Sequence, residues 1–164
     1  MKPLLTLLLS TCFASLLPAE EVFFLDFSQP YFHVESSSLE VSYTIGPRVY
    51  YHYCSESGWA MYEPGESFIQ IGFLNDADTY QKAWLTLTHL ADCDDEMIHA
   101  PITISVNDAV VLKGFSPTKE DFTTDHFDLT GLLQDGPNVL KISLDEEASC
   151  AYEIKSLSLG IEED

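Results

Sequence analysis

The sequence predicts an all-β protein that folds as two packed antiparallel sheets or as a barrel. Helical periodicity is almost absent, apolar residues recur at every second position, and eight to ten such segments follow one another with short turns between them. Strands with one apolar face bury it by packing sheet on sheet or by closing the sheet. No repeat, low-complexity tract or linker divides the chain, and we therefore expect a single domain over residues 20–164.

Residues 1–19 have the layout of a secretory signal and are not expected to belong to the fold. Lys2 precedes an apolar run over residues 4–9, and small residues follow. We expect cleavage after Ala19, with Ala14 as the alternative site. A third possibility is lipid attachment at Cys12, because "LSTC" resembles a bacterial lipobox apart from Thr11. The mature protein is then secreted, periplasmic or held at the cell surface, and no later segment reaches the ~20 apolar residues of a transmembrane helix.

The strand candidates can be justified in order along the chain. In the N-terminal half they are "VFFLDF", "SLEVSYTI", "RVYYHY" and "SFIQIGF". "WLTLTHL" then places Leu85 and Leu87 on one face, and His89 on that face is expected to be a hydrogen-bonded core residue. Residues 101–115 form an expected hairpin, because Asn107 and Asp108 tolerate the positive φ of a tight turn.

The last strand, "YEIKSLSLGI", contains a change of phase. Tyr152 and Ile154 alternate on one face, whereas the apolar positions that follow begin at Leu157. One extra residue in a strand produces such a slip, and we therefore expect a β-bulge near Lys155 and Ser156.

The segment "DHFDLTGLLQDGPNVLKISL", residues 125–144, interrupts two strands with one helical turn. A strand ends at Asp128, which can cap the following turn. Leu132 and Leu133 are expected to close the open edge of the core, and Gly136 permits the reversal into the next strand.

This segment resembles a pattern common in galactose-binding-like β-sandwich domains, D-[VL]-T-x-L-L-x-x-G-x-N followed by alternating apolar residues. The resemblance extends over residues 84–161 and implies a two-sheet antiparallel jelly roll, as in accessory domains of glycoside hydrolases. It implies little about function, because this architecture carries lectins, enzyme accessory modules and purely structural units.

The charge excludes some partners. The chain has 27 acidic against 7 basic residues and a net charge of −20. Nucleic acids and anionic membranes are bound through clustered Lys and Arg, and neither is expected as a partner. The acidity suits cations or neutral ligands such as sugars, although it also simply keeps a secreted domain soluble.

No nucleophile elbow, HExxH, phosphate loop, CxxC or HxxxH motif is present, so we expect neither an enzyme nor a zinc site.

Successive connections of an antiparallel meander alternate between its two ends. The loops at 54–66, 91–100, 115–124 and 145–151 then share one end. Cys93 follows one strand and Cys150 precedes another, and we expect a disulfide between them, with Cys54 as the competing partner. Asp92, Asp94 and Asp95 are candidate ligands for Ca²⁺, which takes six to eight oxygens. The alternative is a solvated acidic rim.

An aromatic cluster lies in "YYHYCSESGWAMYEPGE" at the same end. Trp59 and Tyr62, beside Glu63, are the candidate carbohydrate-binding residues, because exposed rings pack on the apolar faces of sugars. The alternative is that these rings are core, as aromatic residues usually are. The sequence therefore favours a secreted non-catalytic carbohydrate-binding module with Ca²⁺ as candidate cofactor. The alternative function is a structural module, or one that binds a surface protein, with no sugar site.

Overall fold

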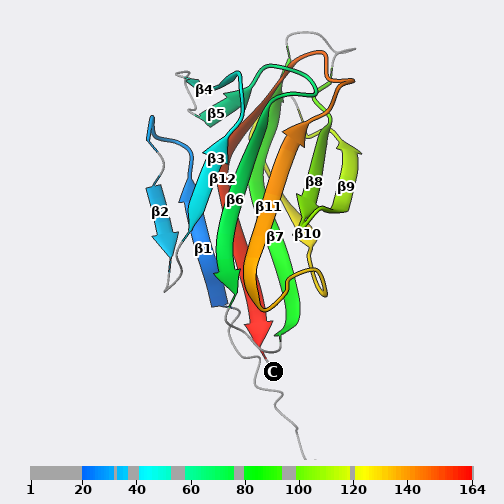
Figure 1. The fold of residues 1–164 in the computed structure, drawn as a ribbon. Helices are drawn as coiled ribbons and strands as arrows, with labels where there is room; N and C mark the ends of the chain where they lie inside the picture. The colour runs from blue at the N-terminus through cyan, green and yellow to red at the C-terminus, as the bar shows by residue number, and fades with distance from the viewer. Residues whose placement is uncertain are drawn as a thin grey trace, which may run out of the picture.

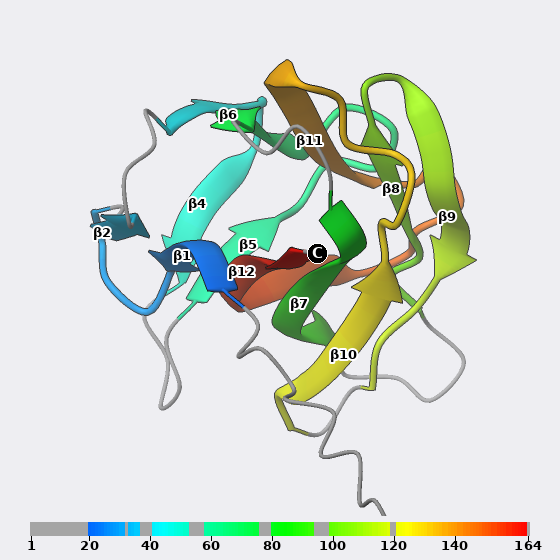
Figure 2. The same cartoon turned by 90° about the horizontal axis from the view of Figure 1, so that it is seen from below.

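The computed structural model describes residues 20–31, 33–36, 41–52, 58–75, 80–93, 99–118 and 121–163. Two antiparallel sheets face each other, as the view along the strands shows (Figure 2). The predicted all-β, two-sheet sandwich is confirmed. The proposed signal segment, together with Cys12 and Cys54, lies outside the described residues. No helix in the described part of the chain is long and apolar enough to cross a membrane.

The first sheet has seven strands and the second has five (Figure 1). The strands of the first sheet are β1 (Glu20–Asp26), β2 (His33–Ser36), β4 (Val49–His52), β5 (Gly58–Met61), β7 (Tyr80–Asp92), β10 (Thr123–Asp128) and β12 (Ala151–Glu163). Those of the second sheet are β3 (Ser42–Ile45), β6 (Phe68–Asn75), β8 (Ile102–Val106), β9 (Ala109–Phe115) and β11 (Gly136–Leu144).

Strand β12 is central to the first sheet, and along one edge it changes partner. Its residues 152–154 pair with β5, whereas residues 156–161 pair with β1. The register against β7 on the other edge shifts between Ile154 and Ser156, which confirms the predicted bulge. At this junction the backbone carbonyl of Lys155 accepts a hydrogen bond from the N–H of Phe27. The bulge thus lies where β12 passes from one neighbour to the other.

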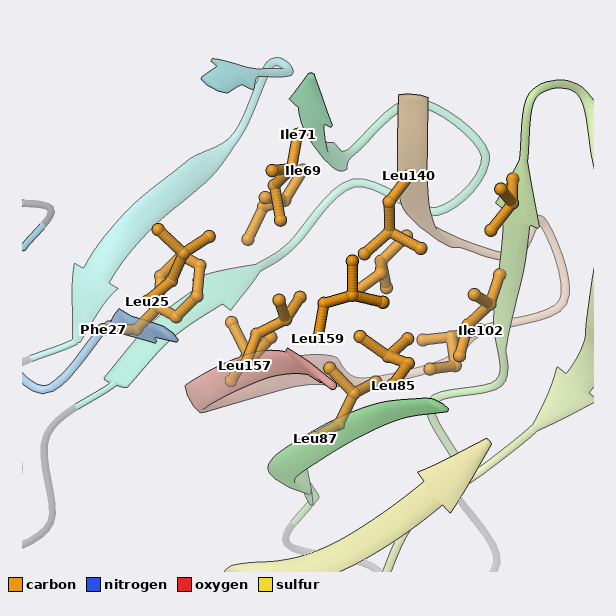
Figure 3. Packing of buried hydrophobic residues seen from close by; sticks show 14 of the residues in the cluster. Leu25, Phe27, Ile69, Ile71, Leu85, Leu87, Ile102, Leu140, Leu157 and Leu159 are labelled. Atoms are coloured by element: carbon orange, nitrogen blue, oxygen red, sulfur yellow. The ribbon is translucent and has the colours of Figure 1, made fainter. Parts of the chain in front are cut away.

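The core fills the space between the sheets with aliphatic side chains from both (Figure 3). Leu85 and Leu87 of β7 and Leu157 and Leu159 of β12 are fully buried, as the period-two pattern predicted. They pack in one cluster with residues of the opposite sheet such as Ile69, Ile71, Ile102 and Leu140.

The helical turn after β10 closes one end of the sandwich. The amide N–H of Thr130 donates to Asp128 Oδ1 at 2.8 Å, which confirms the predicted cap. The apolar plug is Leu129, which is fully buried, together with Leu133. Of the two predicted plug residues, Leu133 is buried, whereas Leu132 is partly buried and packs against the core from its margin. In this turn the side chain of residue 129, directly after the strand, points into the core.

Buried Asn138 ties this turn to the neighbouring hairpin. Its Oδ1 accepts from the amide N–H of Gln134 and from Asn107 Nδ2, at 2.9 and 2.8 Å. Its Nδ2 donates to the carbonyls of Gln134 and Gly136. Asn107 and Asp108 adopt positive φ angles of 49° and 65°, as the hairpin prediction requires.

The prediction for residues 54–66 was wrong in one respect. The sequence predicts a loop over this whole span, but residues 58–61 form β5, which pairs with both β4 and β12. The sequence signal was weak, because "GWAM" is only four residues long and its apolar residues do not alternate. Trp59 therefore lies in strand β5 of the first sheet. Figure 1 shows β5 beside the upper part of β12.

Candidate functional site

The β4–β5 hairpin presents two faces with different side chains. Residues paired across antiparallel strands share a face, and successive residues alternate between faces. Tyr51 pairs with Trp59, which pairs with Ile154 of the core. Tyr50 pairs with Ala60, which pairs with Glu153. Tyr51 and Trp59 thus share the inward face with Ile154, whereas Tyr50 and Glu153 lie on the outer face.

Trp59, the first of the predicted sugar-binding residues, is half-buried on the inward face. Its ring packs beside Tyr51, with ring centroids 6.2 Å apart, and at the margin of the core. The indole Nε1–H donates to the carbonyl of Gln29 at 3.0 Å, and the Tyr51 hydroxyl donates to the carbonyl of Ser28 at 2.8 Å. The two rings attach the segment after β1 to the hairpin, and the polar edge of the indole is already engaged.

Tyr62 and Glu63, the other two predicted sugar-binding residues, lie on the solvent side. Tyr62 is 43 % exposed and Tyr50 is 52 % exposed, and their ring centroids are 6.2 Å apart. Glu63, the next residue, lies 3.9 Å from the guanidinium Nε of Arg48. The Tyr62 amide N–H donates to the carbonyl of Arg48, which holds the start of β4 and the end of β5 together. The result is an exposed pair of tyrosine rings, which we call the tyrosine pair, edged by one acid and one base.

A second feature lies on the same outer face, two residues along β4 from Tyr50. His52 Nδ1 is 3.1 Å from Glu153 Oε2 and 3.7 Å from Asp92 Oδ2. One ligand atom from each of the three residues lies within 4.8 Å of the other two. We call His52, Asp92 and Glu153 the outer-face triad. Its members come from β4, the end of β7 and β12, and β5 lies between β4 and β12.

Glu153 is the unusual member of the triad, because it is only 3 % exposed. Burial raises the pKa of its carboxyl group, and the hydrogen bond and charge of His52 oppose this rise. Its Oε1 is buried and has no hydrogen-bond partner among the described residues. A Cβ at Gly58 would lie 2.7 Å from this oxygen. The absence of a side chain at Gly58 thus makes room for the carboxylate.

The predicted metal ligands are only partly within the described structure. Asp92 is half-buried and faces His52, whereas Asp94 and Asp95 lie outside the described residues. Asp145, another acid at this end, already accepts hydrogen bonds from the Thr103 hydroxyl and the Gly114 amide N–H, at 2.6 and 3.1 Å. Among the described residues, Asp92 thus lies in a group with a histidine and a glutamate.

The predicted disulfide is present. Cys93 and Cys150 are bonded, with their Cα atoms 5.4 Å apart. Asp92 pairs with Ala151 immediately beside the bond. The disulfide therefore fixes the end of β7 against the start of β12, where Asp92 and Glu153 lie.

Two residues of the triad have no role in the site predicted from the sequence. They are His52, which lies in the predicted strand "RVYYHY", and Glu153, which lies in the predicted last strand. His52 and Glu153 are 101 residues apart, so no local spacing links them. The one available signal is an acidic residue between the apolar residues Tyr152 and Ile154. Alternation predicts only that it faces outward, not that it is buried.

Comparisons with known proteins agree with the fold. No protein-family model and no curated protein matches the chain. Among solved structures, a family 35 carbohydrate-binding module from Clostridium thermocellum matches 76 % of this chain and 98 % of its own, with a TM-score of 0.56 at 13 % identity. A family 36 module of a xylanase from the hindgut metagenome of Trinervitermes trinervoides matches 75 % of this chain and 97 % of its own, with a TM-score of 0.55 at 11 % identity. A family 35 module from Paenibacillus barcinonensis matches 75 % of this chain and 98 % of its own, with a TM-score of 0.53 at 11 % identity. The galactose-binding-like jelly roll predicted from residues 125–144 is confirmed as the fold.

Proposed function

We propose that this protein is a secreted, non-catalytic carbohydrate-binding module and that the tyrosine pair is its sugar-contacting surface. The observation that carries the proposal is an exposed pair of rings, Tyr50 and Tyr62, on a fold shared with carbohydrate-binding modules. Tyrosine suits this role because its ring offers an apolar face to sugar C–H groups and its hydroxyl offers a hydrogen bond. Glu63 and Arg48, at the edge of the pair, supply an acceptor and donors for sugar hydroxyls.

Trp59 has a supporting role in this proposal. Its indole packs inward and its Nε1–H is hydrogen-bonded to Gln29, so the ring supports the hairpin from beneath. The outward rings are then held by a rigid, paired strand rather than by a free loop, and this lowers the entropy lost on binding.

A calcium requirement is the finer part of the proposal. It rests on the acidic residues Asp92, Asp94 and Asp95, which supply the oxygen ligands that calcium prefers. A glycan-binding screen is therefore run with calcium and again with a chelator.

The test is a glycan-array screen of the purified protein, followed by affinity measurement on the best ligand. We expect Tyr50→Ala and Tyr62→Ala each to weaken binding at least tenfold, without loss of folding. Tyr43→Ala is the matched control, because Tyr43 is also exposed, at 47 %, but lies on the other sheet. Equal loss of glycan binding in all three variants would argue against the tyrosine pair as the sugar-contacting surface.

The alternative is a structural or protein-interaction module without a sugar site. The inward packing of Trp59 and Tyr51 favours this alternative, because these two rings then stabilise the fold and do not contact a ligand. A folded protein that binds no glycan, with or without calcium, would support this alternative and reject the first proposal.

A further inference from the structure

The outer-face triad combines features that a hydrogen-bonded histidine does not need. A single carboxylate satisfies one imidazole nitrogen, but two carboxylates converge on Nδ1 of His52. One of them, Glu153, is almost completely buried and keeps one oxygen without a partner among the described residues. A buried carboxylate is costly unless it is paired or coordinates a metal.

The ligand atoms have the spacing of a small divalent cation. Two ligands that each lie 2.0–2.2 Å from a tetrahedral ion are about 3.4 Å apart. The two distances from His52 Nδ1 are 3.1 Å to Glu153 Oε2 and 3.7 Å to Asp92 Oδ2. The third separation, between Asp92 and Glu153, is at most 4.8 Å, so one ion can contact one atom of each residue.

The donor set selects the type of metal. Calcium and magnesium prefer oxygen ligands alone, whereas imidazole nitrogen suits zinc and its neighbours in the first transition row. One nitrogen and two carboxylates carry two negative charges when His52 is neutral, which matches the charge of a divalent ion. Three protein ligands would leave a fourth position for water.

The scaffold holds these ligands in place before any metal binds. Glu153 is paired on both sides, with Leu90 of β7 and Ala60 of β5. Asp92 is adjacent to the disulfide, and His52 is opposite Gly58, whose missing side chain makes room for the Glu153 carboxylate. Ligands fixed by strand pairing lose little freedom when the ion binds.

We propose that His52 Nδ1, Asp92 and Glu153 form a binding site for a divalent transition-metal ion of the zinc type. The site shares Asp92 with the proposed calcium ligands but has no residue in common with the tyrosine pair, and both lie on the outer face of the first sheet. No short motif marks it, because its residues are brought together only by the pairing of β7, β12, β5 and β4.

The test is calorimetric titration of the full protein with Zn²⁺ after chelator treatment and dialysis, in buffer that contains excess Ca²⁺. We expect one ion per chain. His52→Gln and Glu153→Gln should each weaken this binding at least tenfold, and each should also remove the visible absorption of tetrahedral Co²⁺. His126→Gln and Glu146→Gln are matched controls, because both residues are exposed and lie outside the triad, and they should bind as the unmodified protein does.

Three outcomes would overturn the proposal. The first is absence of Zn²⁺ binding by folded protein. The second is equal affinity in the triad variants and the controls, which would indicate general attraction of cations to an acidic surface. The third is displacement of Zn²⁺ by Ca²⁺, which would make this a calcium site. Far-UV circular dichroism of each variant shows whether a loss of Zn²⁺ binding results from unfolding. Glycan binding by Tyr50→Ala is measured in a separate experiment, so that failure of the metal proposal and failure of the sugar proposal are distinguished.

Discussion

At the scale of single residues, His89 shows how a polar group is accommodated in the core. The side chain is fully buried. Its Nδ1 is 2.8 Å from the Tyr152 hydroxyl and its Nε2 is 2.9 Å from Asp125 Oδ2. The ring stacks on Phe115 and meets Phe127 edge-on. The predicted hydrogen-bonded core histidine is confirmed.

This environment predicts a pH dependence of stability. Burial lowers the pKa of His89, and the hydrogen bond and charge of Asp125 oppose this only in part. The unfolded chain, with a histidine pKa of about 6.5, therefore takes up a proton before the folded protein does. His89 thus contributes stability that is complete above about pH 6.5 and is lost as the pH falls toward the lowered pKa.

Urea denaturation between about pH 7.5 and 5.5 measures this effect. We expect the free energy of unfolding to fall with pH more steeply in the unmodified protein than in His89→Gln, which cannot titrate there. Parallel pH profiles for the two proteins would show that His89 is not responsible.

At the scale of elements, the turn after β10 buries a leucine to which the sequence pattern gave no role. Leu129 is fully buried beneath the turn, whereas Leu132 packs against the core from its margin. The amide N–H of Leu132 donates to the Leu129 carbonyl, and this closes the turn and fixes which side chain points inward.

We expect Leu129→Ala to lower the free energy of unfolding by 2–5 kcal/mol, the usual cost of a cavity at a buried leucine. Leu132→Ala should cost about 1 kcal/mol, because less apolar surface leaves a packed environment. Chemical denaturation of the two variants measures both values. The reverse order would contradict the assignment of Leu129 as the plug.

At the scale of the whole molecule, the disulfide closes the end of the sandwich where the candidate sites lie. Cys93 and Cys150 are 57 residues apart in sequence, and the bond joins two adjacent strands that already pair along their length. It therefore constrains the unfolded chain more than it reorganises the folded one.

Removal of this bond should lower stability without changing the fold. Chain-entropy arguments set the loss at about 4 kcal/mol or less for a loop of this length. The measurement compares urea denaturation of the protein with that of a Cys93→Ser, Cys150→Ser double variant. If the bond also positions Asp92, the variant should bind Zn²⁺ more weakly, whereas the tyrosine pair should be unaffected.

The sequence by itself determined the features that depend on local pattern. Period-two alternation identified the faces of β7 and β12, the phase slip located the bulge at Lys155, and Asp128 identified the cap of the turn. The positions of Cys93 and Cys150 beside two strands predicted the disulfide. Each of these follows from residues near in sequence, or from the rule that antiparallel strands alternate in direction.

Only the tertiary structure decided which distant residues meet. The short strand β5 forms because β12 and β4 both offer it backbone partners, which no property of "GWAM" reveals. That pairing turns Trp59 inward and Tyr50 outward. It also buries Glu153 beside His52, which is 101 residues away. Alternation encodes the face of a strand on which a side chain lies, but its neighbours on that face depend on pairing between strands, and packing of the whole chain sets that pairing.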